Sequence, residues 1–360
     1  MHDVAVLGGG VAGATAALRL AQHGLRPAWI TGRAQPGFKP GEHLSAAALP
    51  LLKTLGSDAI LRSQVHRHAH STYSAWGSDA LIERNAIVQL EGPPIVLDRI
   101  AFEAAIAEQA VIAGAQRMDG SVQDVTIKTD HWQLAHDTGA ITARFVFDAT
   151  GRKARVASRF ATRFQADKMG CQYGLYTTDP ATAPRPVTLI EAEERGWWYL
   201  SVLADHRVVV NFYTDSDLPG FDTADLDVHA RGTRAISTYL ADYGLSLSGQ
   251  SGRATSNSAW IAPAIGAGWV AIGDASAAFD PLSSHGMTTA LWSAITAADA
   301  FAARDKQKMQ DYADSVAKGV QDFLTARRAV YAREGRWTDS AFWSRRIAPV
   351  APDHAATQEG

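Results

Sequence analysis

Six residues near the start of the chain form a motif that can hold a phosphate group. The run Gly8-Gly9-Gly10-Val11-Ala12-Gly13 fits G-x-G-x-x-G, and it stands between a β-branched apolar run (DVAVL) and an Ala/Leu-rich segment typical of a helix. The first glycine permits a tight turn, the second lets the backbone approach a pyrophosphate, and the third allows close helix–strand contact. Free N–H groups at the helix N-terminus add attraction for the negative charge. We therefore predict Gly8, Gly10, Val11, Ala12 and Gly13 as dinucleotide-binding residues.

One part of this dinucleotide fingerprint is missing. An acidic residue is expected about 20 residues further on, where it holds a ribose hydroxyl. No Asp or Glu lies between Asp3 and Glu42, and Thr31 and Arg33 stand at the end of the next apolar run, PAWIT. A hydroxyl or a basic residue there suits a different ribose contact or a 2′-phosphate, so we include Thr31 and Arg33 among the predicted cofactor contacts. The fingerprint alone leaves NADP and FAD open.

Two later segments also read as strands that end in glycine turns. Ala271 to Ala275 (AIGDA) is followed by DPLSSHGM, a loop that ends at a helix start, and Phe145 to Gly151 (FVFDATG) is the second such turn. Asp274 can accept hydrogen bonds from ribityl-type hydroxyls. The backbone amides from His285 to Met287 would face a negative charge at the helix N-terminus.

Histidine and cysteine carry weaker signals. His66, His68 and His70 alternate, so a strand would place them on one face, which permits a metal site. No Cys or carboxylate stands at ligand spacing from them, and we predict no metal. Cys171 is the only cysteine, so it cannot form an internal disulfide, and we expect it to be a small buried residue.

The elements that must position these residues follow from hydrophobic periodicity and turn signals. An opening strand–helix–strand unit is followed by helices, a β-rich middle, a helical segment at 223–243 and long helices at 286–303 and 306–334. This order predicts an α/β fold with a Rossmann-like FAD- or NADP-binding domain, an inserted β-sheet substrate domain and C-terminal helices. We assign 1–70, 98–165 and 255–330 to the first domain, 71–97 and 166–254 to the second, and 331–360 to a C-terminal helix and tail.

Composition excludes several classes of protein. The 360 residues carry a formal net charge of −3 with no block of like charges, so the electrostatic footprint of a nucleic-acid binder is missing. The apolar segment 4–21 has no basic region before it and contains three consecutive glycines, unlike a signal peptide. No uninterrupted apolar run is long enough to span a membrane. We expect a cytoplasmic protein that binds neither nucleic acid nor membrane.

In order and spacing, these motifs resemble the FAD-dependent superfamily of p-hydroxybenzoate hydroxylase and the flavin-dependent halogenases. GEHL at 41–44, LDR at 97–99 with Phe102, and GWWY at 196–199 look like the G-E-x-x, L-D-R-x-x-F and G-W-x-W segments of the halogenase-like branch. The resemblance runs from residue 4 to about residue 300. It implies FAD as the cofactor, and it adds to the predicted FAD contacts the residues Arg99, Asp274, Pro281, Ser284, Gly286 and Met287.

The departures from this pattern concern the reaction. Halogenases of this type use a lysine near the segment that corresponds to Thr72–Gly77, where this chain has none, the nearest being Lys53 and Lys128. Ser283 and His285 stand where the tryptophan halogenases carry Glu and Thr in a P-L-E-S-T-G loop. Without these halogenase residues, the chain looks most like the short flavoproteins for tryptophylquinone cofactor biogenesis, of the lysine ε-oxidase maturation type. This implies an FAD-dependent monooxygenase that hydroxylates an indole or phenol ring, with a Trp side chain of a partner protein among the candidate substrates.

His285, Glu42 and His43 are the predicted proton-handling residues, because their segments are expected near the flavin and histidine titrates near neutral pH. No second G-x-G-x-x-G follows a strand, so NAD(P)H would bind transiently or a separate reductase would deliver the electrons. Two alternatives stay open within the oxidoreductases, a flavin-dependent halogenase and a flavin-dependent reductase. A third alternative, from another class, is a non-catalytic flavoprotein chaperone of a partner enzyme.

Overall fold

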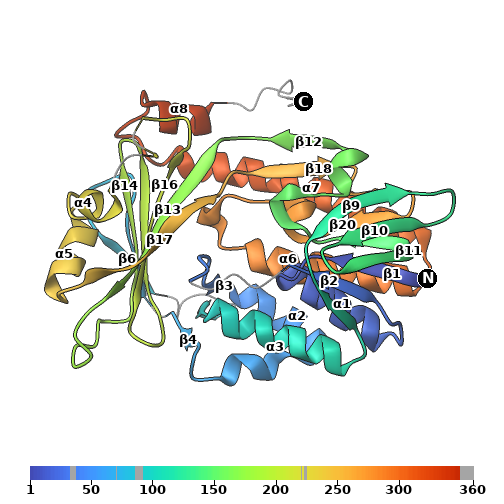
Figure 1. The fold of residues 1–360 in the computed structure, drawn as a ribbon. Helices are drawn as coiled ribbons and strands as arrows, with labels where there is room; N and C mark the ends of the chain where they lie inside the picture. Colours follow the sequence, from blue (N-terminus) through green and yellow to red (C-terminus); the bar gives the residue numbers. More distant parts are fainter. Residues whose placement is uncertain (33–37, 70, 86–91, 220, 223–224, 349–360) are drawn as a thin grey trace.

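The protein folds into two lobes joined along one side (Figure 1). The computed structural model describes residues 1–32, 38–69, 71–85, 92–219, 221–222 and 225–348. The first lobe holds the chain start and most of the long helices, and the second is built around a separate sheet.

An eight-stranded sheet forms the centre of the first lobe. Its order is β19 (Ile265–Gly266), β20 (Trp269–Ala271), β11 (Gly139–Asp148), β1 (His2–Leu7), β2 (Ala28–Thr31) and β8 (Gln116–Asp119), with β10 (Trp132–His136) and β9 (Val122–Ile127) continuing from β11. The five strands from β20 to β8 run parallel. Their carboxyl ends therefore lie along one edge, which is where open α/β sheets bind ligands.

Helices cover this sheet and bring together segments that are far apart in the sequence. Helix α1 (Val11–Gln22) packs against α3 (Arg99–Ile112) and α6 (Gly286–Ala302), while α7 (Lys306–Tyr331) packs outside α6. Small side chains allow this close approach, since α1 is rich in alanine and nearly all of it is buried. Shorter helical segments complete the lobe: η1 (Ala46–Ala48), α2 (Leu49–Thr54), η2 (Asp58–Arg62), η4 (Gly151–Lys153), η5 (Ala157–Arg159), η6 (Gly273–Ala275) and η7 (Pro281–Ser283).

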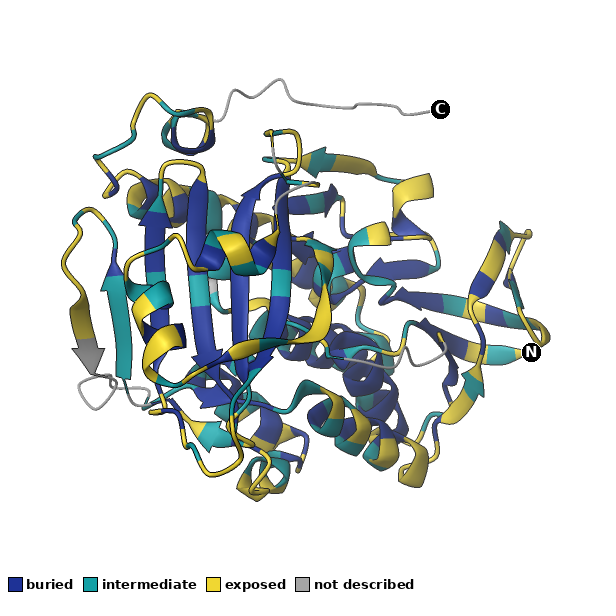
Figure 2. Ribbon diagram, turned by 60° about the vertical axis from the view of Figure 1, so that its left-hand side comes forward, coloured by how far each residue is buried: buried dark blue, intermediate teal, exposed yellow. Residues whose placement is uncertain are grey.

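A seven-stranded sheet forms the second lobe. Its order is β17 (Ser246–Thr255), β13 (Met169–Thr177), β16 (Val208–Asp215), β15 (Gly196–Val202), β14 (Thr188–Glu193), β5 (Ser71–Ala75) and β6 (Ile82–Asn85), antiparallel except for the β14–β5 pair. Trp198, Leu200 and Val210 face α4 (Leu226–Ala230) and α5 (Ala235–Asp242). Trp197 and Tyr213 lie on the opposite face, toward α7 and α8 (Ala341–Ile347). Figure 2 shows the middle strands buried and the helices in front of them partly exposed.

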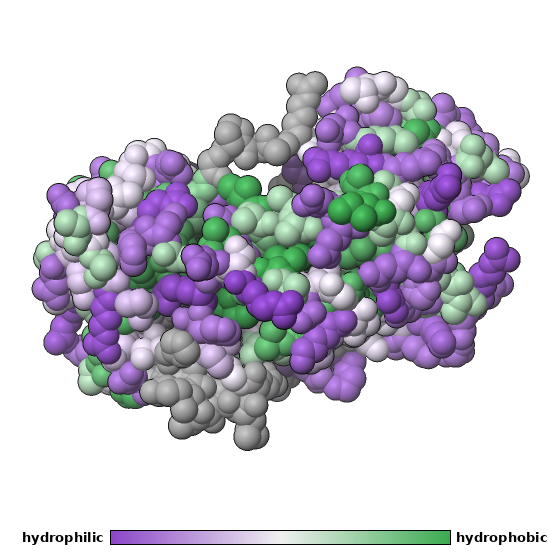
Figure 3. Space-filling model, turned by 90° about the horizontal axis from the view of Figure 1, so that it is seen from below, coloured by the Kyte–Doolittle hydropathy of each residue, from purple (hydrophilic) through white to green (hydrophobic). Residues whose placement is uncertain are grey.

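Two small sheets lie between these parts. One is β12 (Thr162–Gln165), β18 (Ala259–Ala262) and β21 (Ala277–Ala278), and the other is β3 (His43–Leu44), β7 (Ile95–Val96) and β4 (Arg67–His68). Seen from below, hydrophobic residues gather across the middle of the molecule, between the lobes, with hydrophilic residues to either side (Figure 3).

Some sequence-based expectations about elements are wrong. The segment 223–243 is not one helix, because α4 ends at Ala230 and α5 begins only at Ala235. The strand β17 was not expected, since its residues are mostly polar and exposed. The alternating histidines do not lie along one strand, because β4 holds only Arg67–His68, His66 precedes it, and His70 lies outside the described residues. The division of the chain into domain ranges stays a prediction.

Candidate functional site

Three turns that are far apart in sequence meet at the carboxyl edge of the parallel sheet. They follow Leu7 of β1, Asp148 of β11 and Ala271 of β20, which belong to adjacent strands. The contact is close: a Cβ added to Gly8 would lie 2.1 Å from the Ala149 carbonyl oxygen, and one added to Gly273 would lie 2.7 Å from the Ala12 Cβ. The glycine motif, the D-x-x-G turn and the G-D-A turn therefore form one surface.

The glycine motif has the geometry that a pyrophosphate requires. Gly8 has a φ of +123°, and a Cβ on Gly13 would come within 1.9 Å of the Gly8 carbonyl oxygen, so both positions exclude larger residues. Gly10 is different, because its backbone is extended and no atom lies within 4 Å of its Cβ position. No side chain caps the first turn of α1, and that turn contains no acidic residue. Open space beside Gly10 and uncapped amides fit a dinucleotide phosphate.

A carboxylate from a neighbouring strand lies beside Thr31. Thr31, at the end of β2, donates a hydrogen bond from Oγ1 to Asp119 Oδ1 over 2.9 Å, and Asp119 ends β8, the next strand in the sheet. The hydrogen bonds from Thr31 and Arg117 lower the pKa of the Asp119 carboxyl. Sequence reasoning missed Asp119 because nothing local indicates that it lies beside Thr31. Arg33 lies outside the described residues.

Two of the motif residues hold loops in place. The buried Asp148 carboxylate accepts hydrogen bonds from the backbone N–H groups of Thr150, Val156 and Ala157. Arg99, the first residue of α3, donates to the Pro40 carbonyl and pairs with Glu103 at 2.6 Å. The buried Nε of Arg99 has no hydrogen-bond partner among the described residues.

Buried charged side chains hold the loop from Asp280 to His285, which precedes α6. Asp280 is 1% exposed; its Oδ1 accepts from the Leu282 N–H, and its Oδ2 accepts from Arg327 Nε at 3.1 Å and from Tyr331 Oη at 2.8 Å. Arg327 also donates to Asp167 at 2.9 Å. Pro281, Ser284, Gly286 and Met287, the predicted contacts of the flavin ring, follow directly. Helix α7 thus sets the position of this loop.

Glu42 and His43 lie together between the lobes. His43 Nε2 is 3.2 Å from Thr188 Oγ1, and the His43 ring stands edge-on to the ring of Tyr199 at 5.7 Å. Burial, with a contribution from Arg67, lowers the pKa of His43 to about 4. Glu42 is 1% exposed, and burial raises its pKa. Interactions with the Tyr199 side chain and with Arg99 partly offset this rise.

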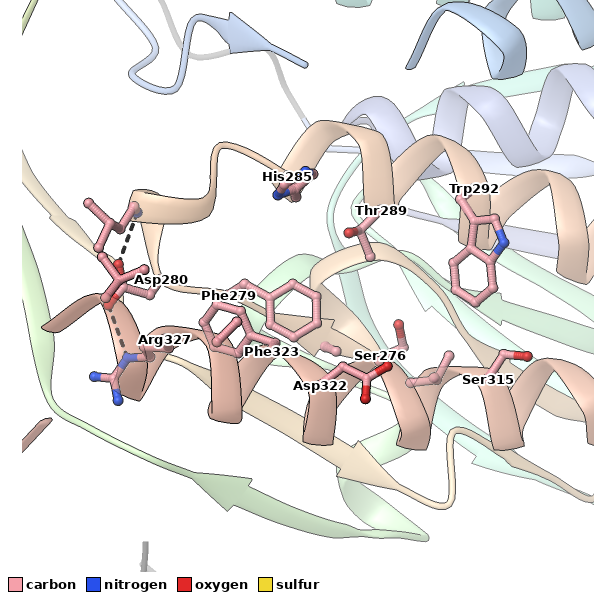
Figure 4. A pocket seen from close by; sticks show the side chains of 16 residues that line it. Ser276, Phe279, Asp280, His285, Thr289, Trp292, Ser315, Asp322, Phe323 and Arg327 are labelled. Carbon is pink, nitrogen blue, oxygen red and sulfur yellow. Dashed lines mark hydrogen bonds and ion pairs between the residues drawn. The ribbon is translucent and has the colours of Figure 1, made fainter. Parts of the chain in front are cut away.

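His285 belongs to a different element and lines an open cavity. It precedes the first residue of α6 and is exposed. The cavity, of about 710 Å³, lies between α6 and α7 and is bounded by the loop from Ser276 to His285. In Figure 4, His285 stands just before α6, and Thr289 and Trp292 come from α6 on the same side, while Asp322, Phe323 and Arg327 come from α7 on the other.

An aromatic cluster occupies the end of β5. The Trp76 ring lies 5.1 Å from that of Trp343, 5.6 Å from that of Tyr331 and 6.2 Å from that of Trp197. The indole of Trp76 donates to the Val330 carbonyl at 3.1 Å. This is the segment in which the resemblance places the halogenase lysine, and here it packs against α7 and α8.

Three further features concern the cysteine, metal binding and membrane spans. Cys171 is buried, and burial raises its pKa. Within the described ranges, no three His, Cys, Asp or Glu side chains come together as a metal ion would require. Nor does any described helix combine the length and the apolar character needed to cross a bilayer.

The structure therefore brings together the glycine motif, Thr31 and Asp274 at one sheet edge, with the loop from Pro281 to Met287 at the start of α6. Asp274 is partly exposed and lies 3.7 Å from Arg152 Nε. The open cradle at Gly10, the uncapped α1 and the carboxylate beside Thr31 fit FAD. The roles of the individual site residues stay predictions.

Comparison with known proteins agrees with this arrangement. The family model of tryptophan halogenase matches residues 93–358, and that of an FAD binding domain matches residues 3–89. A protein of Marinomonas mediterranea named as an FAD-dependent oxidoreductase, LodB, is 25% identical over 99% of both chains. The tryptophan 2-halogenase of Chondromyces crocatus is 22% identical over 82% of this chain and 60% of its own length.

Solved structures show the same fold. The myxobacterial chondrochloren halogenase CndH superposes with a TM-score of 0.83 and 22% identity, covering 96% of this chain and 85% of the other. The peptidyl tryptophan dihydroxylase QhpG, described as essential for tryptophylquinone cofactor biogenesis, gives a TM-score of 0.76 and 24% identity, covering 96% and 79%. Both support the predicted α/β fold.

Proposed function

Because this chain belongs to the tryptophan halogenase family and carries an FAD-binding domain, we propose that it is a monooxygenase that hydroxylates the indole ring of a tryptophan side chain in a partner protein. The family match makes the protein an FAD-dependent oxidoreductase of the halogenase-like type. The likeness to QhpG supports hydroxylation as the reaction and a tryptophan within a polypeptide as the substrate.

The observation that carries the proposal is the position of the loop from Asp280 to His285. On one side this loop leads into the first turn of α6, where the FAD ring is expected, and on the other it lines the cavity between α6 and α7. When bound, FAD supplies the electrons that activate dioxygen for transfer of one oxygen atom to the ring. The chain supplies position, because Arg327 and Tyr331 hold Asp280 and so fix the loop.

Hydroxylation is favoured over halogenation by the aromatic cluster at Trp76. The segment Thr72–Gly77 contains no lysine, and none of the residues that line the cavity is a lysine. At the end of this segment the Trp76 ring packs against those of Trp343 and Tyr331, so the segment offers no amine that could pass on an oxidised halide. The family match and the CndH fold keep halogenation as the second candidate.

The three proton-handling candidates differ in what they can do. His43 is neutral at pH 7 because its pKa is about 4, so it acts as a hydrogen-bonding group beside Thr188 and not as an acid. Glu42 keeps its proton to a higher pH than an exposed glutamate, because burial disfavours the carboxylate. Of the three, only His285 is exposed and lines the cavity, and we propose it as the acid or base that acts on the ring.

The test is to supply purified FAD-loaded protein with dioxygen, chloride and a tryptophan-containing peptide. One arm provides NADPH or NADH alone, and a second adds a separate flavin reductase. We expect the peptide to gain the mass of one or more oxygen atoms, with the flavin bleached in at least one arm. Chlorine in place of hydrogen would establish the halogenase instead, and no flavin reduction in either arm would contradict both enzymes.

A further inference from the structure

We propose that the cavity between α6 and α7 is the receiving site for the indole side chain of a tryptophan presented on a partner polypeptide. This rests on the proposed function, since it names where that substrate binds. The cavity is about 710 Å³ in volume, within the range of pockets that enclose most of a small organic ligand.

The walls of the cavity are aromatic and incompletely covered. Phe279, from the loop after η6, and Phe323, from α7, lie with ring centroids 4.5 Å apart and tilted by 37°. Trp292 of α6 stacks on Tyr312 at 5.7 Å and is itself only partly buried. A further aromatic ring can add to such a pair in an offset or edge-to-face arrangement, which contributes about 0.5–1.5 kcal/mol beyond area burial.

The polar groups at the cavity favour a ligand that donates a hydrogen bond. Thr289 and Ser315 offer hydroxyl oxygens at the cavity, and Asp322 offers a carboxylate that also pairs with Lys318 on the same helix. Arg327 already donates to two buried carboxylates, those of Asp280 and Asp167. An indole N–H therefore has hydrogen-bond acceptors among the residues that line this cavity.

The open side of the cavity suits a polypeptide. Ser315, Gly319 and Ala326 of α7 line it, and all three are small and exposed. Because these side chains project little from the surface of α7, the backbone of a partner polypeptide can lie across the helix while one of its side chains points into the cavity. The volume also exceeds the needs of a single ring, which leaves room for residues that flank the tryptophan.

One end of the cavity reaches the expected flavin ring. His285 lines the cavity and immediately precedes Gly286, the first residue of α6. A ring packed against the Phe279–Phe323 pair therefore lies next to the loop from Pro281 to His285. This loop leads directly into the first turn of α6, where the flavin ring is expected.

Gly319 provides the test, because a Cβ added there meets no atom within 4 Å. Gly319→Leu adds an isobutyl group at the cavity wall, and leucine is a good helix former, so the variant should fold. Gly335→Leu is the matched control, since a Cβ on Gly335 also meets nothing within 4 Å and Gly335 is not among the residues lining the cavity. The probe is a short peptide with one central tryptophan, and its binding to FAD-loaded protein is measured by calorimetry.

We expect Gly319→Leu to weaken binding of the peptide about tenfold or more, a loss that calorimetry resolves, while Gly335→Leu binds as the parent does. FAD affinity and melting temperature should be unchanged in both variants. Equal peptide affinity in the two variants would overturn the proposal. So would equally tight binding of a matched peptide with leucine in place of tryptophan, or of free indole.

Failure of this inference can be told apart from failure of the proposed function. If Gly319→Leu loses peptide binding but the parent protein never oxygenates the peptide, the cavity is the site and the reaction is wrong. If Gly319→Leu oxygenates the peptide with unchanged kcat/KM, the reaction is right and the cavity is not its site.

Discussion

Thr31 Oγ1 donates a hydrogen bond to Asp119 Oδ1 over 2.9 Å, across the ends of two adjacent parallel strands. Thr31 stands where the dinucleotide fingerprint expects a carboxylate, and Asp119 brings one to the same edge from β8. The Asp119 side chain is 69% exposed, so it can turn toward a ligand. We infer that Asp119 replaces the missing acidic residue as the contact to the adenosine ribose of FAD.

Asp119→Ala should therefore weaken FAD binding. A hydrogen bond to a charged group is worth about 1.5–3 kcal/mol, which corresponds to roughly a tenfold to hundredfold rise in the FAD Kd. The Kd can be measured by quenching of flavin fluorescence. Asp124→Ala is the control, because Asp124 is an exposed carboxylate on the neighbouring β9. Equal Kd values for the two variants would show that Asp119 does not contact the cofactor.

Gly10 and Gly13 should respond differently to alanine. Gly10→Ala meets open space in the protein alone, so its melting temperature without FAD should stay unchanged, while its Cβ would occupy the space that the phosphate needs. Gly13→Ala places a methyl group 1.9 Å from the Gly8 carbonyl oxygen and should lower the melting temperature even without FAD. Thermal unfolding with and without FAD measures both effects. A Gly10→Ala protein that takes up FAD normally would contradict the phosphate site.

Arg327 should be essential for stability. It pairs with Asp280 and Asp167, and all three side chains are at most 5% exposed. Arg327→Met leaves two buried carboxylates without their cation, which costs about 3–5 kcal/mol in the free energy of unfolding. Tyr331→Phe removes only the hydroxyl that joins Trp197 to Asp280, so about 1–3 kcal/mol is expected. Urea denaturation measures both, and an Arg327→Met protein as stable as its parent would refute this account.

The His43 pKa makes a prediction about acid stability. Its folded-state pKa, about 4, lies below the unfolded value of 6.5, so the unfolded chain binds the proton more readily. The stabilisation from keeping this ring neutral is therefore fully present above pH 6.5. As the pH falls from 6.5 toward 4, the free energy of unfolding decreases by up to about 3 kcal/mol. His43→Gln should remove that part of the slope when unfolding free energy is measured across this range. An identical slope in both proteins would mean that His43 is not held neutral.

Much of the first lobe could be predicted from the sequence, because its signals are local. Glycine spacing between a strand and a helix predicted the dinucleotide turn. The LDR segment at 97–99 stands at the start of α3, where the Asp98 carboxylate accepts a hydrogen bond from the Ala101 N–H. The β-rich middle could also be predicted, from segments such as Trp197 to Leu203. The polar strand β17 escaped detection, because its pairing with β13 and not its composition makes it a strand.

What the sequence determined by itself was the dinucleotide turn and the superfamily, since these depend on residue types a few positions apart. Only the tertiary structure decided that Asp119 stands beside Thr31, that Arg327 and Tyr331 of α7 hold Asp280, and that α6 and α7 leave a cavity between them. These pairs lie tens of residues apart, and Thr31 and Asp119 are separated by 88 positions. Hydrogen bonds and packing across such distances depend on how whole elements pack, which no local pattern encodes.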